Sequence, residues 1–260
     1  MRANELKMLW YKSWLETRWR FLIGLVLLIC SALSTVFTYP QVMKLLPMAQ
    51  NLPINGEIGR RIREAVELSR DFRGYVWSNW FRQNLSQTWT LFAVLIGTGG
   101  FLSHATGGGT LFTLSMPVSR NRLLGVRSTT GLIELFVLAL VPSILIPLFS
   151  PAIGQHYGVG SALVYSVCLF VAGSVFFSLA ALLSTMFSDI WRPLLIALAI
   201  AVVLSIVEQI SQISFGIFHV MHGESYFRTG ALPWAGLLAS AALSVALQYA
   251  AATNITRRDF

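Results

Sequence analysis

The sequence carries little charge, and this shortage excludes several classes of protein. Of its 260 residues, 12% are Asp, Glu, Lys or Arg, whereas soluble domains carry about 25%. Hydrophobic residues make up 55% of the chain, and the mean hydropathy is +0.65. An ordinary soluble enzyme, a disordered tail and a nucleic-acid-binding domain are therefore excluded. The composition predicts a polytopic helical membrane protein.

The sequence also lacks the short motifs of nucleotide hydrolysis and hydrolytic catalysis. It has no G-x-x-x-x-G-K-[S/T] loop, and no lysine follows Lys44, so the chain does not hydrolyse ATP by that route. Neither H-E-x-x-H nor G-x-S-x-G occurs. His219, His222 and Glu224 are spaced so that they could touch one ion, but a polar loop at an interface is the favoured interpretation. We predict that the chain is not an enzyme and binds no cofactor or metal.

Cysteine is scarce, and the basic residues have a membrane explanation. Cys30 and Cys168 both fall inside apolar runs, so neither a disulfide framework nor a metal-ligand spacing follows from them. The 19 Lys and Arg exceed the 11 Asp and Glu. These basic residues flank apolar runs. Their excess is therefore better explained by a location at the membrane surface than by nucleic-acid binding.

Apolar runs predict six membrane-spanning helices in one all-α transmembrane domain over residues 1–260. A spanning helix needs about 20 apolar residues. We expect the spans at 21–39, 85–105, 129–149, 160–186, 194–214 and 232–252. Pro40 is expected to end the first span, and Pro142 and Pro147 to kink the third.

Two further helices are predicted outside the spans. Residues 1–20 alternate aromatic and basic side chains, which predicts an interfacial helix lying in the headgroup region before the chain turns inward. Residues 40–84 form the longest polar connection, and the apolar spacing of Ile58, Ile62 and Val66 predicts an amphipathic helix within it. The aromatic residues near its end predict a return to the membrane interface; they are Tyr75, Trp77, Trp80 and Phe81.

The distribution of basic residues predicts which ends of the spans face the cytosol. With six spans both termini lie on one side, and placing them inside puts eleven of the 19 basic residues on the inner side. The two outer turns other than 40–84 carry almost none. The positive-inside rule therefore predicts cytoplasmic termini.

Two acids lie within the predicted spans. A carboxylate in hydrocarbon costs several kcal/mol unless it is paired, protonated or exposed to a wet cavity. Glu134 either has a structural partner, such as Arg127, or takes part in translocation or coupling. Glu208 either lines an outer vestibule or occupies a solvated helix end.

The last span carries small residues at a regular spacing. Gly236, Ser240 and Ser244 recur every four residues, a pattern that lets helices approach closely. This face packs either within the chain or against a second copy.

The segment over residues 107–127 is the most distinctive part of the sequence. Three glycines break the helix, and a short semi-apolar stretch leads to Pro117 and then to Arg120, Arg122 and Arg127. A positively charged loop that only sets the topology is one interpretation. The other is a docking site, in which Pro117 fixes a turn that presents Arg120 and Arg122 to acids on a partner.

The run from Leu114 to Arg120, Leu-Ser-Met-Pro-Val-Ser-Arg, resembles the cytosolic segment of ATP-binding-cassette (ABC) type-2 transporter permeases. That family commonly shows a Leu-x-x-Pro-[Val/Ile]-Ser-Arg pattern between its second and third spans. The ending Arg257-Arg258-Asp259-Phe260 is similar to the family's basic-acidic tail, and the helix over 1–20 resembles its elbow helix. The long charged loop over 40–84 departs from the pattern and leaves the substrate open.

The resemblance implies an exporter subunit in a bacterial inner membrane. It would pair with a second copy or a related permease, and with ATPase subunits that hold ATP and Mg²⁺. It assigns partner docking to Leu114, Pro117, Arg120 and Arg122. Three alternatives stay open: a gradient-driven transporter using Glu134, an intramembrane enzyme using His104 with Glu134, and a membrane anchor for a complex.

Overall fold

The computed structural model describes residues 2–50, 66–98, 120–187, 189–211 and 216–257, and almost all of them are helical. The long helices are α1 (Arg2–Gln50), α4 (Ser86–Thr98), α6 (Arg120–Phe149), α7 (Val159–Met186), α8 (Trp191–Ser211) and α11 (Trp234–Arg257). The shorter elements are α3 (Phe72–Val76), the π-helix η1 (Trp77–Leu85), the 3₁₀ helix η2 (Ser150–Ile153), α9 (Ile217–Met221) and α10 (Glu224–Thr229). The predicted all-α fold is confirmed for these residues.

Within the described residues, five helices are long and apolar enough to cross a membrane. They cover Lys7–Leu45, Arg122–Ile153, Val159–Met186, Trp191–Ile210 and Trp234–Thr256. The last four agree with the predicted third to sixth spans, because each apolar run is long enough to form a spanning helix. The predicted second span, 85–105, is described as far as residue 98, where α4 ends. These helices are those of a membrane protein.

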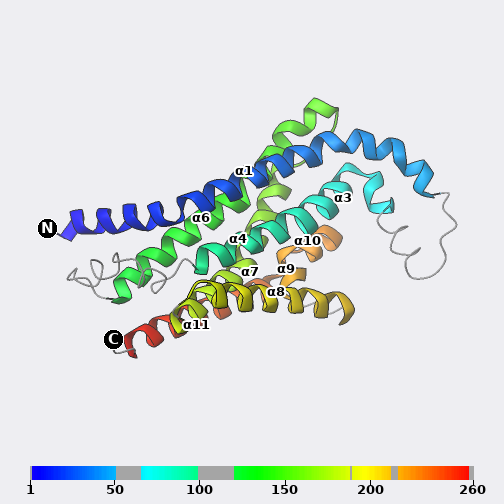
Figure 1. Cartoon of the computed structure of the whole chain (residues 1–260). Helices are drawn as coiled ribbons and strands as arrows, with labels where there is room; N and C mark the ends of the chain where they lie inside the picture. The colour runs from blue at the N-terminus through cyan, green and yellow to red at the C-terminus, as the bar shows by residue number, and fades with distance from the viewer. Residues whose placement is uncertain (1, 51–65, 99–119, 188, 212–215, 258–260) are drawn as a thin grey trace.

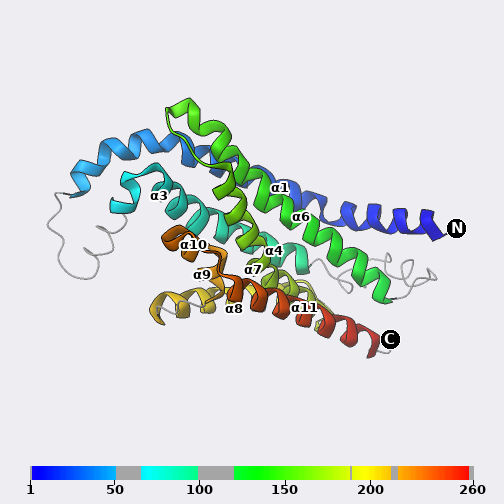
Figure 2. The ribbon, with the colours of Figure 1, turned by 180° about the vertical axis from the view of Figure 1, so that it is seen from behind.

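The long helices form a bundle with both chain termini at the same end, which we call the termini end (Figures 1 and 2). The first turns of α6 lie at this end too, whereas α3 and the last turns of α1 lie at the opposite end. Helix α7 is the central element. In its most apolar stretch of 18 residues 67% is buried within the protein, against 22% in the corresponding stretches of α8 and α11. The helices with the least burial therefore form the rim of the bundle.

The first helix differs from the prediction at both of its expected boundaries. Helix α1 runs without a break from Arg2 to Gln50, through residue 20 and through Pro40. The interfacial helix and the first span are thus one helix, and the prediction that Pro40 ends it is wrong. Proline removes one backbone hydrogen bond, but Val36 and Tyr39 next to that lost bond are buried and hold the helix in place.

The aromatic residues at the end of the 40–84 connection lie in the core. Tyr75, Trp77, Trp80 and Phe81 are all buried, and Trp80 is fully inaccessible. Tyr75 packs against Tyr39 of α1 with ring centroids 5.0 Å apart. Neighbouring helices cover these side chains, so they pack within the protein, and the expected return to the membrane interface stays a prediction. Most of the predicted amphipathic helix within 40–84 lies outside the described residues.

The small-residue face of α11 packs within the chain, against α7. The hydroxyl oxygens of Ser244 and Ser178 are 2.7 Å apart, and Gln248 Nε2 donates to Ser178 Oγ at 3.3 Å. Ser128 of α6 donates to Gln248 Oε1 at 3.0 Å. A polar ladder thus joins α6, α11 and α7, which confirms intramolecular packing for this face.

The contact between Gly173 and Trp89 generates a prediction about stability. A Cβ at Gly173 would overlap the Trp89 ring, and this ring is fully buried with its Nε1 donating to the Leu135 carbonyl at 2.9 Å. Overpacking of this kind costs about 1–3 kcal/mol. We expect Gly173→Ala to lower the thermal unfolding temperature of the detergent-solubilised protein.

Gly160→Ala is the matched control, because Gly160 also lies in α7 but a methyl group added there would have no neighbouring atom within 4 Å. It should unfold at the wild-type temperature or above it, since alanine favours helix over glycine by about 1 kcal/mol. Equal unfolding temperatures for the two variants would contradict the close packing of α4 on α7.

Candidate functional site

The predicted docking residues are placed only in part. Leu114 and Pro117 lie outside the described residues, as does His104 of the enzyme alternative. Arg120 is the first residue of α6, and the next described basic side chain, Arg122, is exposed. Arg122 is thus accessible to a partner, and the first turns of α6, to which it belongs, lie at the termini end of the bundle (Figure 1).

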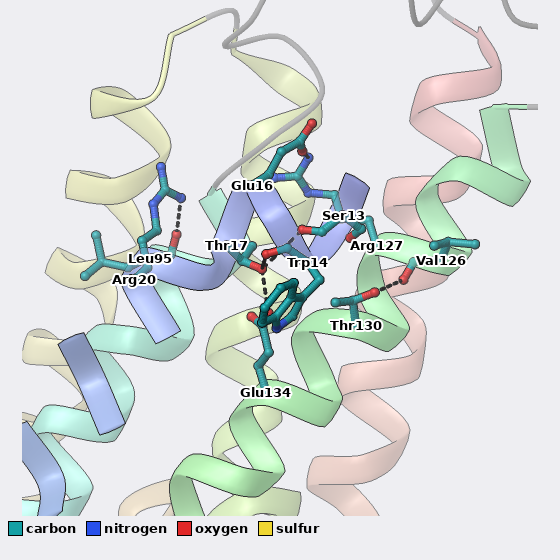
Figure 3. Close-up of polar contacts among 10 residues, drawn as sticks. All are labelled: Ser13, Trp14, Glu16, Thr17, Arg20, Leu95, Val126, Arg127, Thr130 and Glu134. Atoms are coloured by element: carbon teal, nitrogen blue, oxygen red, sulfur yellow. Dashed lines mark hydrogen bonds and ion pairs between the residues drawn. The ribbon is translucent and has the colours of Figure 1, made fainter. Parts of the chain in front are cut away.

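Glu134 is a buried acid of the bundle and contacts α1 (Figure 3). The residue is 4% exposed, and its Oε1 accepts a hydrogen bond from Thr17 Oγ1 at 2.5 Å. Its Oε2 is buried and has no hydrogen-bond partner in the described part of the chain. Leaving a buried polar atom without a hydrogen bond costs about 1–3 kcal/mol of stability. The Glu134 carboxyl group is therefore only partly compensated for its loss of water.

The expected structural partner of Glu134, Arg127, is directed to another acid. Arg127 forms an ion pair with Glu16 of α1, with Nη1 and Oε2 3.3 Å apart, and both side chains are largely buried. The helical spacing between residues 127 and 134 favours a pair within α6. The packing of α1 along α6 adds Glu16 as an ion-pair partner of Arg127 and Thr17 as a hydrogen-bond donor to Glu134, while Arg127 also interacts electrostatically with Glu134. Figure 3 shows this arrangement, which depends on the tertiary structure.

A third polar contact from the same turn of α1 reaches α4. Arg20 Nη1 donates to the main-chain carbonyl of Leu95 in α4 at 2.7 Å. Glu16, Thr17 and Arg20 therefore bond α6 twice and α4 once from a single helical turn, and we call these three residues the α1 joint. The sequence signal for the joint is an acid and a base four residues apart inside an otherwise aromatic and basic helix.

A small recess opens beside the α1 joint. Thr17 and Arg127 line it together with Gly97 of α4 and Phe177 and Ser184 of α7. A Cβ at Gly97 would lie 2.7 Å from the Phe177 carbonyl oxygen, so α4 and α7 approach closely at this level. The recess therefore lies where four helices meet.

Glu208 has a structural role that neither sequence interpretation anticipated. Its Oε2 accepts hydrogen bonds from the backbone N–H groups of Phe218 at 2.9 Å and His219 at 3.2 Å. These N–H groups belong to the first turn of α9, where a carboxylate is favourable. Glu208 therefore ties the end of α8 to the start of α9.

The two histidines of α9 and the turn after it have different partners. His219 Nδ1 lies 3.1 Å from Glu224 Oε2, whereas His222 Nε2 lies 3.1 Å from Ser86 Oγ. These separate partners argue against a shared ion, and the described residues contain no cluster of three His, Cys, Asp or Glu side chains that could hold a metal.

A stack of aromatic and basic side chains covers the π-helix at the end opposite the termini. The rings of Trp77 and Phe227 stack with centroids 4.3 Å apart and planes 9° from parallel. Arg82 lies 5.6 Å from the Trp77 ring, and Arg73 lies 5.9 Å from the Phe227 ring. Cation–π contacts of this geometry stabilise by about 0.5–1 kcal/mol at exposed sites. The stack fixes α10 on η1.

The comparisons add no relative to these observations: no family model, no curated protein and no solved structure matches this chain. The candidate site accordingly rests on its own geometry. It comprises the buried acid Glu134, the α1 joint and the exposed Arg122, all in the half of the bundle that ends at the termini.

His222 generates a prediction about pH dependence. Burial, with Arg82 and His219 nearby, lowers the pKa of His222 to about 3, against 6.5 for an unperturbed histidine. The unfolded chain therefore binds a proton between these values that the folded chain does not, and stability falls as pH drops below about 6.5. Thermal unfolding between pH 7 and pH 4 should show this loss.

We expect His222→Gln to flatten that pH dependence, because glutamine retains a hydrogen-bonding side chain and does not titrate. The exposed His156→Gln is the control and should follow the wild-type curve. A His222→Gln protein that loses stability on acidification as steeply as the wild type would argue against a buried neutral imidazole.

Proposed function

We propose that this chain is the membrane-spanning permease subunit of an ABC exporter, which moves a substrate by means of ATP hydrolysed in a separate ATPase subunit. The observation that carries the proposal is the run from Leu114 to Arg120, together with an exposed Arg122 at the termini end. A membrane chain with no nucleotide-binding loop requires an external energy source. A basic, solvent-accessible helix start suits contact with an acidic surface of a motor protein.

Both termini and the start of α6 are assigned to the cytoplasmic side of a bacterial inner membrane. The basis is the excess of basic residues at that end. The geometry supports one shared side, because the termini and the first turns of α6 lie together in both views (Figures 1 and 2). A docking partner on that side would reach the start of α6 directly.

One more crossing, the second in chain order, is assigned to the consecutive elements α3, η1 and α4, and it brings the total to six. They form a continuous helical run from Phe72 to Thr98, long enough at about 1.5 Å per residue to traverse the hydrocarbon core. This run leads from the end that holds α3 towards the termini end (Figure 1). Six crossings then agree with two termini on one side.

The functional unit contains a second permease subunit, either another copy or a related chain. Helices α8 and α11 expose large apolar side chains and are the least buried of the spanning helices. Lipid covers part of this rim, and the second subunit covers the rest.

A gradient-driven transporter is the second candidate function. One observation favours it: Glu134 is a buried acid within a spanning helix, and its Oε2 has no hydrogen-bond partner in the described residues. Intramembrane acids are frequent in proton relays. This candidate predicts transport without any ATPase subunit.

Co-purification tests the proposal. A tagged chain, solubilised gently from its native membrane, should retain an ATPase subunit. We expect Arg120→Glu combined with Arg122→Glu to reduce the retained ATPase by about tenfold, since two exposed ion pairs together contribute about 1–2 kcal/mol. Quantitative immunoblotting of the purified complex measures the ratio of the two subunits.

Arg192→Glu is the control, because Arg192 lies at the start of α8 and its side chain is 71% exposed. It should leave the ratio unchanged, which would separate docking from a general effect of charge. Absence of any ATPase subunit from the wild-type preparation, with transport intact in its absence, would favour the gradient-driven alternative.

A further inference from the structure

The α1 joint concentrates inter-helix polar contacts in one turn of one helix. Glu16 bonds Arg127 of α6, Thr17 bonds Glu134 of α6, and Arg20 bonds the Leu95 carbonyl of α4. Residues 16, 17 and 20 lie on neighbouring positions of the helix surface, so one local movement of α1 affects all three contacts. Figure 3 shows Glu16 and Thr17 facing Arg127 and Glu134 of α6, and Arg20 directed separately to Leu95 of α4.

The bond between Thr17 and Glu134 is the most buried of the three. Thr17 is 3% exposed and Glu134 is 4% exposed. Thr17 Oγ1 also lies 3.2 Å from the Ser13 carbonyl, and its single proton can serve only one acceptor at a time. An ionised Glu134 accepts that proton, whereas a neutral side chain donates to Thr17, which then donates to Ser13. The contact therefore forms with either a charged or a neutral partner at position 134.

The charged groups around Glu134 balance one another. Helix α1 contributes Glu16 and Arg20, and α6 contributes Arg127. Helices α4 and α7 contribute Ile96, Gly97, Phe177 and Ala181 to the adjacent recess. A change of position at the joint would separate paired charges in a region with little water, and such a change has a large energetic effect.

We propose that Glu134 is a positioning residue of the transport cycle, which acts through Thr17 to keep α6 seated on the α1 joint while Arg20 of the same joint holds α4. The joint links the helix that starts at Arg120 to a second helix of the bundle. A displacement of the α6 start by a bound partner is thereby transmitted to α4 and not absorbed within α6. This inference rests on the proposed function.

Near-isosteric variants of Thr17 and Glu134 test the inference. Thr17→Val removes the hydroxyl at nearly constant volume, and Glu134→Leu removes the polar head. Thr17→Ser and Glu134→Gln retain a hydrogen-bonding group and should rescue the contact. Each variant is purified as the complete complex with its ATPase subunit, reconstituted in lipid nanodiscs, and assayed for ATP hydrolysis and for retained ATPase.

We expect Thr17→Val and Glu134→Leu to lower the kcat for ATP hydrolysis about fivefold, the scale of a coupling contact, with the KM for ATP and the subunit ratio unchanged. Thr17→Ser and Glu134→Gln should stay within about twofold of the wild type. Arg20→Met, which retains the apolar stem but not the donors, should match Thr17→Val.

The outcomes distinguish this inference from the proposed function. An intact complex in which Thr17→Val and Glu134→Leu hydrolyse ATP at the wild-type kcat would overturn the positioning role and leave the exporter assignment in place. A lower kcat in Glu134→Gln equal to that in Glu134→Leu would also overturn it. If the wild-type chain retains no ATPase subunit, the proposed function itself fails.

Discussion

The contact between Glu134 and Thr17 is the interaction on which the termini end of the bundle depends. A buried carboxyl group in a helix that crosses lipid has no bulk water to solvate it, so its partners must come from neighbouring helices. Thr17 is supplied by α1 only if α1 remains helical across residue 20 and lies along α6. The unbroken α1, the ion pair of Glu16 with Arg127 and the bond of Arg20 to α4 all follow from this alignment.

Buried polar groups have different kinds of partner at the two ends of the bundle. At the termini end, Glu16 and Arg20 of α1 bond to Arg127 of α6 and to the Leu95 carbonyl of α4. At the opposite end, aromatic rings fill the space, and the polar groups of Trp77 and His222 bond to a backbone carbonyl and a hydroxyl. Separating the paired charges of the α1 joint would be costly, and the aromatic layer at the other end is close-packed.

Helix α7 connects these two regions and explains why the rim helices tolerate exposure. It contacts α4 through Gly97 and Gly173, where the helix backbones and the Trp89 ring come close, and α11 through Ser178. Small residues on α7 and its neighbours allow this close approach, as in other membrane bundles. Helices α8 and α11 then need only one packed face each, and their remaining surface is available to lipid or a second subunit.

Composition and apolar run length alone determined the membrane class and the positions of α7, α8 and α11, because partition into lipid depends on about 20 consecutive residues. They also marked Glu134 and Glu208 as unusual. The tertiary structure decided what these acids bind, since Thr17 lies 117 residues from Glu134 and no local pattern reports such a distance. It likewise decided that α1 continues through Pro40 and that Trp77 and Trp80 are buried, because packing against distant helices outweighed the local preferences of proline and tryptophan.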